Sequence, residues 1–169
     1  MTPIFDPNET LTANRIQLSR LDHSALKQME TWLALSLTPD WPEYALEAAT
    51  EAGSAVLITD AATSAPIGAA VALLDAPIEG AAAIPFISID PTRRYRGLGG
   101  EATLALERHI RKRFGVERVY APIPDWRGLA VYFWLRQGYR PVTFAEAPWP
   151  LTGLVPEPRP GIWMLRDTA

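Results

Sequence analysis

The 169-residue chain contains no cysteine, so disulfides, thiolate metal ligands and a cysteine acyl-enzyme are all excluded. It has only two histidines, His23 and His109, which disfavours a histidine-based metal site, and we expect no metal. No window approaches the roughly 18 consecutive apolar residues of a membrane-spanning helix. The opening stretch MTPIFDPNET lacks the basic segment and apolar run of a signal peptide. We therefore expect a cytoplasmic protein that does not associate with membranes.

Basic residues are absent between positions 39 and 90, whereas residues 93–118 hold seven arginines and one lysine. The whole chain carries a formal net charge of -3 and a sequence pI near 5.4. A general nucleic-acid-binding protein usually needs a basic face, so we expect no nucleic-acid partner. The uneven distribution predicts instead that one site on an acidic protein is locally positive.

The periodicity of the apolar residues predicts a single α/β (α+β) domain over residues 1–169. It has a mixed sheet of about seven strands with helices on both faces, and the first 9–12 residues could remain disordered. We expect the helix at 127–137 to be buried on more than one side because it is apolar almost all round, and His109 to lie on a helix surface. The predicted strands are 14–21, 54–60, 66–74, 83–90, 117–123, 139–144 and 161–166, and the predicted helices are 22–37, a short one ending at Gly53, 97–114 and 127–137.

The stretch RRYRGLGGEA (93–102) joins a predicted strand to a predicted helix. Its glycines, Gly97, Gly99 and Gly100, permit backbone conformations and close approaches that a Cβ would forbid. A strand that enters such a turn and a helix that leaves it direct free N–H groups at one spot, where the helix dipole adds positive potential. The three arginines add charge-assisted donors. Together these features predict a diphosphate site.

A P-loop, a dinucleotide fingerprint and a turn without a ligand each fit this stretch less well. A P-loop needs Gly-Lys-Ser or Gly-Lys-Thr, and neither follows. GLGGEA fits the G-x-G-x-x-A dinucleotide fingerprint. That fingerprint, however, follows the first strand of a βαβ unit, and an acidic residue lies about 20 positions later, at the end of the next strand. Here four predicted strands come first, and Glu117 begins the next strand. A turn without any ligand would leave three arginines repelling one another with no anion.

RYRGLG resembles the Arg/Gln-x-x-Gly-x-Gly/Ala signature of the GNAT superfamily of acyl-CoA-dependent N-acyltransferases. About forty residues later, LAVYFWLRQGYRPV is similar to the second hallmark of that superfamily, Ala-x-x-x-aromatic followed by Gly-aromatic. The resemblance covers roughly residues 80–145 and implies a GNAT-like, mostly antiparallel sheet. The matching positions are Arg94, Gly97 and Gly99 in the first motif and Ala130, Trp134, Gly138 and Tyr139 in the second.

In this family the glycine turn holds the diphosphate of coenzyme A, and the end of the preceding strand pairs with the pantetheine arm. The resemblance therefore implies acetyl-CoA as the co-substrate. The coenzyme-binding residues that it implies are Ile87, Ser88, Ile89, Arg94, Tyr95, Arg96, Gly97, Leu98, Gly99, Gly100 and Arg127, the last standing where an asparagine is common.

The sequence departs from the family at two catalytic positions. Trp134 stands where many members place a tyrosine as the acid toward the coenzyme sulfur, and an indole N–H can donate a hydrogen bond but not a proton. Pro85 stands where many members carry a glutamate base. Trp134 is kept as a catalytic candidate, and Glu79, in the turn before the strand at 83–90, as a candidate base.

The resemblance places the acceptor where the first two predicted helices meet the proline-rich segment 145–160. Trp32, Trp41 and Trp149 are candidates for an apolar pocket there, although Trp32 could equally be a core residue. We expect an N-acetyltransferase that acts by direct transfer in a ternary complex on an amine of a small molecule or peptide. The alternative is a GNAT-fold module that binds acyl-CoA with weak or no catalysis. A homodimer is a possible assembly of this chain.

Overall fold

The computed structural model describes residues 2–34, 43–124, 128–142 and 161–167. Within these residues, no helix combines the length and apolar character needed to cross a membrane. The described residues form four α-helices, one 3₁₀ turn, η1, and eight strands. The helical elements are α1 (His23–Leu33), α2 (Glu43–Glu51), η1 (Pro91–Arg93), α3 (Leu98–Phe114) and α4 (Gly128–Arg136). The strands are β1 (Thr10–Ala13), β2 (Ile16–Arg20), β3 (Ala55–Asp60), β4 (Pro66–Leu74), β5 (Ala82–Ile89), β6 (Arg118–Pro124), β7 (Arg140–Val142) and β8 (Gly161–Asp167).

All eight strands form one sheet in the order β1-β2-β3-β4-β5-β6-β8-β7. Every neighbouring pair is antiparallel except β5 and β6, which are parallel. The mixed, mostly antiparallel sheet is confirmed, but it has one strand more than predicted. The single strand expected at 14–21 is the second half of a hairpin, because Asn14 adopts a left-handed conformation (φ 44°) and turns the chain between β1 and β2.

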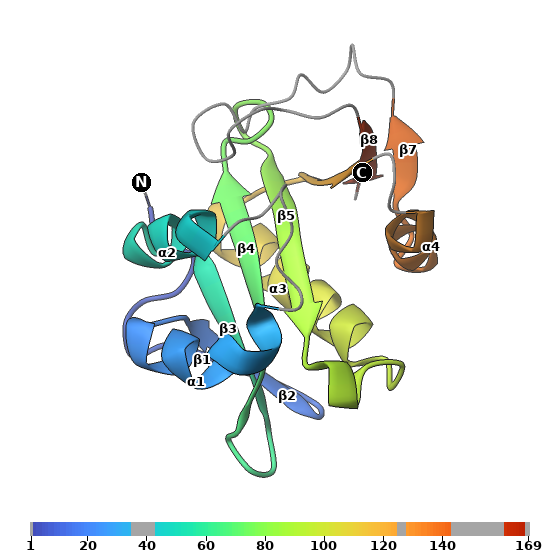
Figure 1. Ribbon diagram of the computed structural model, residues 1–169. Helices are drawn as coiled ribbons and strands as arrows, with labels where there is room; N and C mark the ends of the chain where they lie inside the picture. The colour runs from blue at the N-terminus through green and yellow to red at the C-terminus, as the bar shows by residue number, and fades with distance from the viewer. Residues whose placement is uncertain (1, 35–42, 125–127, 143–160, 168–169) are drawn as a thin grey trace.

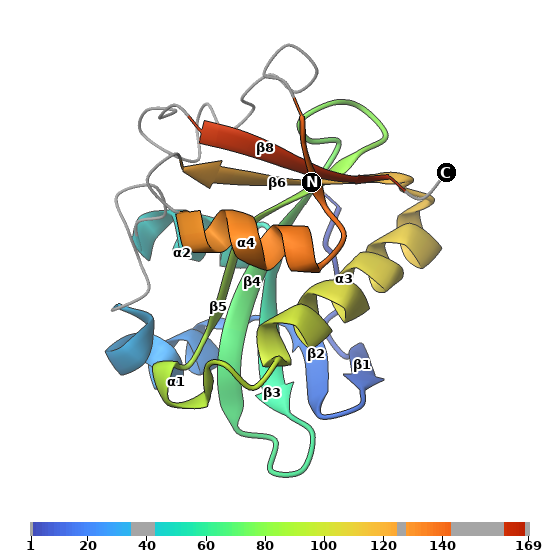
Figure 2. The ribbon, with the colours of Figure 1, turned by 90° about the vertical axis from the view of Figure 1, so that its right-hand side faces the viewer.

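Helices cover both faces of the sheet, as predicted. α1 and α2 lie on one face, and α3 and α4 lie on the other (Figures 1 and 2). Two separate apolar clusters match these faces, one containing Met29 and Leu46 and the other Leu106 and Ile110. The N-cap of α1 is Asp22, whose carboxylate accepts from the Ala25 N–H at 2.8 Å, so the helix begins where the sequence predicted it.

The N-terminal segment is partly a core element. Ile4 and Phe5 are fully buried, and the Ile4 N–H donates to the Gly53 carbonyl at 3.0 Å. The Phe5 ring stacks on His109, with ring centroids 4.1 Å apart. Disorder through the first 9–12 residues is therefore wrong at these two positions. The surface location predicted for His109 is wrong as well, because Phe5 covers its ring.

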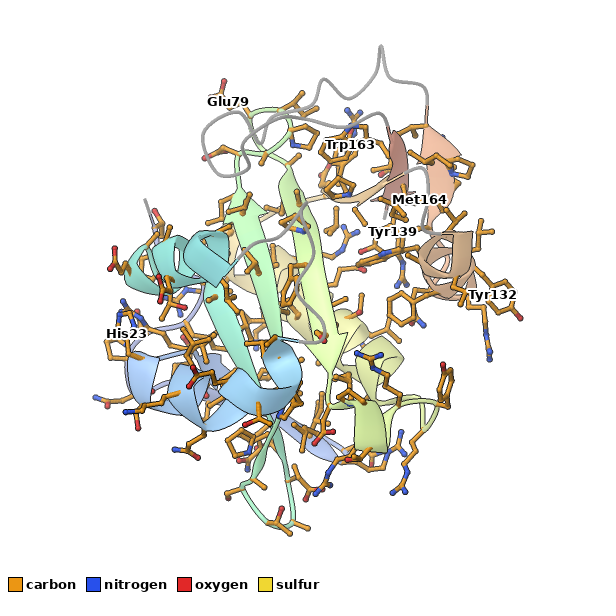
Figure 3. All side chains as sticks on the ribbon, viewed as in Figure 1. His23, Glu79, Tyr132, Tyr139, Trp163 and Met164 are labelled. Atoms are coloured by element: carbon orange, nitrogen blue, oxygen red, sulfur yellow. The ribbon has the colours of Figure 1, made fainter. Side chains whose placement is uncertain are left out.

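The prediction that α4 is buried on more than one side is wrong. Trp134 is its single fully buried side chain among the described residues. Leu129 and Tyr132 are 85% and 60% exposed, and Tyr132 points away from the domain in Figure 3. Ala130, Val131 and Phe133 are partly buried against the same core, whereas Leu129, Tyr132 and Leu135 are exposed, so the helix is buried along one side.

Candidate functional site

The turn after β5 begins with a compact cap built by Asp90. One carboxylate oxygen of Asp90 accepts from both the N–H and the hydroxyl of Thr92, each at 2.8 Å. The Asp90 carbonyl accepts from the Arg93 N–H at 2.8 Å, which closes η1. The chain therefore leaves β5 along a defined path that leads to the glycines.

The three arginines of this turn have different partners. Arg93 forms a 3.0 Å ion pair with Asp60, the last residue of β3. Arg94 donates from Nε to the Ile89 carbonyl at 3.0 Å. The Arg96 side chain is exposed and has no partner among the described residues. Arg96 is thus the guanidinium most available to an incoming anion, while Arg93 is already neutralised.

The N-terminus of α3 has backbone donors that no side chain caps. Gly97 is the N-cap, with φ 78°, and no side chain caps the helix. The N–H groups of Leu98, Gly99 and Gly100 donate to no acceptor within the described part of the chain. Tyr95 is also left-handed (φ 63°) and 102% exposed, an uncommon conformation for a residue with a Cβ. Free N–H groups at a helix start form a ready anion-binding site.

Arg15, in the turn between β1 and β2, contacts the residues on either side of the glycines at 97, 99 and 100. It donates from Nη1 to the Arg96 carbonyl at 3.0 Å, and its Nε and Nη2 lie 3.0 and 2.8 Å from Oε2 of Glu101. The sequence analysis missed this contact. No local sequence pattern predicts it, because Arg15 lies 81 positions from Arg96 and 86 positions from Glu101.

Helix α4 packs directly against the glycines. A Cβ built on Gly99 would lie 3.5 Å from Phe133, an ordinary contact distance. A Cβ on Gly100 would lie 2.6 Å from the side-chain amide nitrogen of Gln137, closer than any real contact. The second motif of the sequence therefore packs onto the first, and it supports the start of α3.

Strands β5 and β6 separate after a short parallel ladder. The pairs are Ala82 with Val119 and Ala83 with Tyr120, and no pair follows among the described residues. Pro85 in β5 and Pro122 in β6 each lie two residues beyond the last pair and have no N–H to donate. These prolines explain why the ladder stops.

Beyond Pro85, no described strand pairs with the edge of β5 that faces β6. The Asp90 N–H donates to the Ile67 carbonyl of β4. The N–H and C=O groups of successive residues in a strand point to opposite edges of the strand. The backbone groups of Ile87 and Ile89 are therefore directed away from β4, toward β6. The Arg94 contact with the Ile89 carbonyl agrees with this direction. Ser88, by the same alternation, faces β4.

Trp134 and Tyr139, the aromatic residues at the matching positions of the second motif, are core residues. Trp134 is 5% exposed and packs edge-to-face on Phe133 and Tyr139, with ring centroids 5.3 and 4.7 Å apart. The Tyr139 hydroxyl donates to Glu107 at 3.0 Å, and burial, followed by the Glu107 charge, raises the pKa of Tyr139 well above its usual value. Tyr139 therefore keeps its proton, and Gly138 (φ 86°) ends the helix as predicted.

The remaining predicted residues are dispersed. Glu79 is exposed in the β4–β5 turn, the opposite end of β5 from the glycine turn (Figure 3). Trp32 is half-buried and packs against the core on the α1 and α2 face. Arg127, Trp41 and Trp149 lie outside the described residues.

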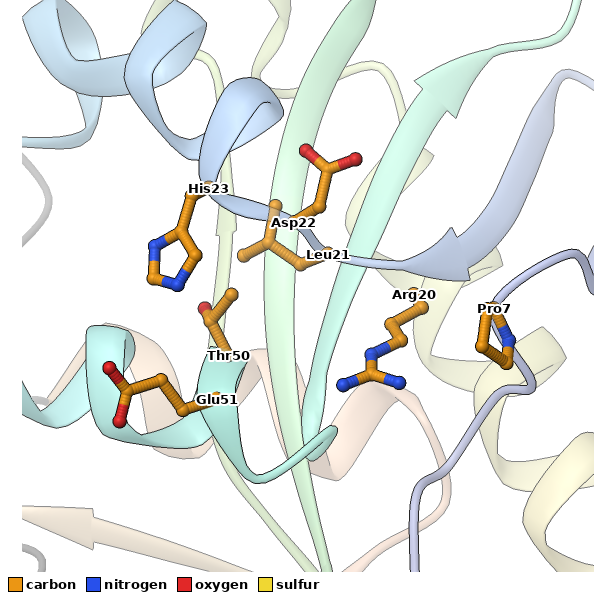
Figure 4. Close-up of a pocket in the computed structure, with 7 residues that line it drawn as sticks. All are labelled: Pro7, Arg20, Leu21, Asp22, His23, Thr50 and Glu51. Atoms are coloured by element: carbon orange, nitrogen blue, oxygen red, sulfur yellow. The ribbon is translucent and has the colours of Figure 1, made fainter.

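A hollow of about 300 Å³ lies on the α1 and α2 side of the molecule (Figure 4). Arg20 and His23 contribute groups that carry or can accept positive charge, and Asp22 and Glu51 contribute carboxylates. It contains none of the predicted site residues. Among the described residues, no group of three or more histidine or acidic side chains is arranged to hold a metal ion.

A sequence model described as the acetyltransferase (GNAT) family matches residues 26–139. A structure from Vibrio cholerae, assigned as a ribosomal-protein-serine acetyltransferase, is 17% identical with a TM-score of 0.74, covering 95% of this chain and 98% of that one. A GCN5-related N-acetyltransferase from Brucella melitensis is 15% identical with a TM-score of 0.72, covering 98% and 80%.

Naa50 from Arabidopsis thaliana, solved in complex with the bisubstrate analogue CoA-Ac-MVNAL, is 14% identical with a TM-score of 0.64, covering 90% of this chain and 99% of that one. No curated protein sequence matches this chain significantly. At these identities the structures establish a shared fold, and the sequence model of the family adds evidence that does not depend on them.

Proposed function

The chain belongs to the acetyltransferase (GNAT) family, and on that premise we propose that it transfers an acetyl group from acetyl-CoA to an amine of a small molecule or peptide. The observation that carries this proposal is the start of α3. There, the N–H groups of Leu98, Gly99 and Gly100 donate to no acceptor among the described residues, and they directly follow the exposed Arg96 and the left-handed Gly97 in the chain. This arrangement suits a diphosphate.

The neighbouring surfaces suit the rest of the coenzyme. The open edge of β5 offers backbone groups of Ile87 and Ile89 to an extended amide-containing chain, which is the chemistry of the pantetheine arm. The Ile89 carbonyl is shared with Arg94, which links the diphosphate end to the strand. Arg127, just before α4, is proposed as a further coenzyme contact.

Acetyl transfer then follows from direct attack. The neutral amine nitrogen adds to the thioester carbonyl carbon, the C–S bond breaks, the sulfur leaves with the electron pair, and the ammonium proton passes to water or a base. Keeping a lysine-like amine neutral at pH 7 costs about 4.6 kcal/mol, so a base or a desolvating pocket must offset part of this cost. Glu79 is the proposed base, acting through water, although it is exposed. The absence of cysteine favours a ternary complex over a thiol-bound intermediate.

The two buried aromatic residues of the second motif, Trp134 and Tyr139, offer no proton to the leaving sulfur. Tyr139 is held by Glu107 with a raised pKa, and Trp134 has only an indole N–H. A simple thiol has a pKa near 8.5, so the thiolate is a tolerable leaving group without an acid. We propose that it departs unprotonated, with Trp134 acting through packing.

The acceptor is proposed to lie near α1, where Trp32 is half-buried, with Trp41 and Trp149 as further candidates. The analogue bound by Naa50 joins coenzyme A, acetyl and a peptide, which supports a peptide amine as one acceptor class. The second candidate function is an acyl-CoA-binding module with little catalysis. The proline at position 85 and the buried Trp134 favour it, because both replace groups that assist catalysis in the family.

Two measurements test the proposal together. Calorimetry should show binding of acetyl-CoA by the wild-type protein, weakened in the Arg96→Gln variant. A thiol reagent should then report coenzyme A released with a panel of amines and N-terminal peptides, without background from protein thiols. Binding without release by any amine would support the binding module. No binding at all would overturn both functions.

A further inference from the structure

Arg15 makes an unusually complete set of contacts for a side chain that is half exposed. Besides its side-chain contacts to Arg96 and Glu101, its backbone N–H donates to Oε1 of Glu101 at 2.7 Å. Both carboxylate oxygens of Glu101 are thus engaged by one residue. A planar guanidinium that holds a carboxylate and a carbonyl together fixes geometry as well as charge.

The carbonyl that Arg15 holds belongs to the residue just before Gly97. The orientation of the Arg96–Gly97 peptide fixes the direction in which the chain enters α3. The Glu101 N–H donates back to the Gly97 carbonyl at 3.0 Å, so the same short segment is tied at both ends. Arg15 therefore restrains the backbone from which the N–H groups at residues 98–100 project.

Arg15 also offsets the repulsion expected between the Glu101 carboxylate and the proposed diphosphate. Glu101 lies in the first turn of α3, within reach of the proposed diphosphate, and its side chain is only 16% exposed. An uncompensated carboxylate there would repel a dianion and would cancel part of the positive potential of the helix start. Pairing with Arg15 neutralises Glu101 and leaves Arg96 to face the ligand.

The hairpin that carries Arg15 is itself anchored. The Arg15 carbonyl accepts from the Ala61 N–H at 2.9 Å. Asp60, which precedes Ala61, forms the ion pair with Arg93. Asp60 is kept ionised because hydrogen bonds from the N–H groups of Ala62 and Thr63 lower its pKa. The β1–β2 and β3–β4 turns are thus hydrogen-bonded to each other, and both contact the segment that contains Arg93 and Arg96.

We propose that Arg15 is a positioning residue for the coenzyme diphosphate, acting through the Arg96 carbonyl and the Glu101 carboxylate. This inference rests on the proposed function, because it concerns the same coenzyme. Arg15 does not touch the coenzyme. Its loss loosens the N–H groups at the start of α3 and exposes the ligand to the Glu101 charge.

The test measures dissociation constants by calorimetry for coenzyme A and for dephospho-coenzyme A, which lacks the 3′-phosphate but keeps the diphosphate. The variants are Arg15→Gln, Arg15→Lys, Glu101→Gln and the double variant. Arg108→Gln is the matched control, because it removes the same charge from an exposed residue of α3. Unfolding midpoints recorded on the same samples show that each variant is folded at the temperature of measurement.

Arg15→Gln should weaken both ligands equally, by about tenfold. Arg15→Lys should recover part of the loss. The double variant should bind more tightly than Arg15→Gln alone, because the unpaired carboxylate is gone, and Arg108→Gln should bind like the wild type.

Unchanged affinity in folded Arg15→Gln would overturn the inference while leaving the proposed function intact. A loss confined to coenzyme A would overturn it too, since Arg15 would then contact the 3′-phosphate. A double variant weaker than Arg15→Gln would rule out the electrostatic part. If the wild type binds neither ligand, the proposed function fails first and the inference falls with it.

Discussion

The Tyr139 hydroxyl donates a 3.0 Å hydrogen bond to Oε2 of Glu107, a carboxylate that is only 3% exposed. Arg111 completes the arrangement from the next turn of α3, with its Nε 3.0 Å from Oε1 of the same carboxylate. Arg166 of β8 lies 3.5 Å from Oε2. A buried carboxylate is tolerated only when it is paired and hydrogen-bonded. The aromatic residue of the second motif therefore joins α3 to the end of α4, while β8 closes the cluster.

Tyr139→Phe should lower the free energy of unfolding by about 1–2 kcal/mol at pH 7, because Glu107 loses one donor while it stays buried. Tyr132→Phe, the same change at a 60% exposed position of α4, should alter it by less than about 0.5 kcal/mol. Urea unfolding of both variants measures the difference. Equal effects at the two positions would mean that the Glu107 contact adds no stability.

The same pair predicts how stability depends on pH. Burial raises the pKa of Tyr139 above the ordinary value of 10.0, so folding favours the protonated hydroxyl. This contribution is fully present below pH 10 and is lost as the pH rises above it. The unfolding free energy of the wild type should therefore fall more steeply above pH 10 than that of Tyr139→Phe. Parallel curves for the two proteins in that range would contradict this assignment.

Arg96→Gln should weaken coenzyme A binding by about tenfold or more, because a free guanidinium is available to make charge-assisted hydrogen bonds. Arg93→Gln, three residues away with the same change in charge, should have a much smaller effect, since Asp60 already neutralises Arg93. Calorimetry at two salt concentrations separates the two variants: removing Arg96 should flatten the salt dependence, and removing Arg93 should leave it nearly unchanged. A larger effect from Arg93 would reverse the roles assigned to these side chains.

Local signals in the sequence predicted the backbone of the glycine turn. Three glycines beside three arginines indicated a free helix start, and the structure has the left-handed Gly97 there with no side-chain cap. The caps at Asp22 and Gly138 were also predictable, because capping depends on neighbours only a few residues away. These features are decided by short stretches of chain.

Other features depend on contacts between distant residues. Three similar arginines in sequence have different environments because Asp60 meets Arg93 across 33 positions and Arg15 reaches Arg96 across 81. The exposure of Leu129 was unpredictable for a related reason. The sequence of an apolar helix shows which side chains could be buried, but the elements that pack against the helix determine which side chains are buried. No local pattern carries that information.

Gly97→Ala should reduce both stability and coenzyme affinity, because φ 78° suits glycine and an alanine there costs about 1–2 kcal/mol. Gly115→Ala is a close control: it is the C-cap of the same helix with φ 69°, and a Cβ there would meet nothing within 4 Å. Both variants should lose similar unfolding free energy in urea. Only Gly97→Ala should raise the dissociation constant of coenzyme A, and an equal rise in both would show that affinity follows general stability.

Trp134 provides the sharpest test of how the sulfur leaves. Its ring packs against Phe133 and Tyr139, so Trp134→Phe and Trp134→Tyr both shrink a core side chain and should cost about 1–3 kcal/mol of unfolding free energy. If the thiolate departs without a protein acid, kcat with the best amine of the panel should agree within about threefold between the two variants. They differ only in the phenol hydroxyl, which makes each the control for the other. A kcat for Trp134→Tyr more than about tenfold above both Trp134→Phe and the wild type would mean that the native reaction is limited by a missing acid. In that case, unaided departure of the thiolate would have to be abandoned.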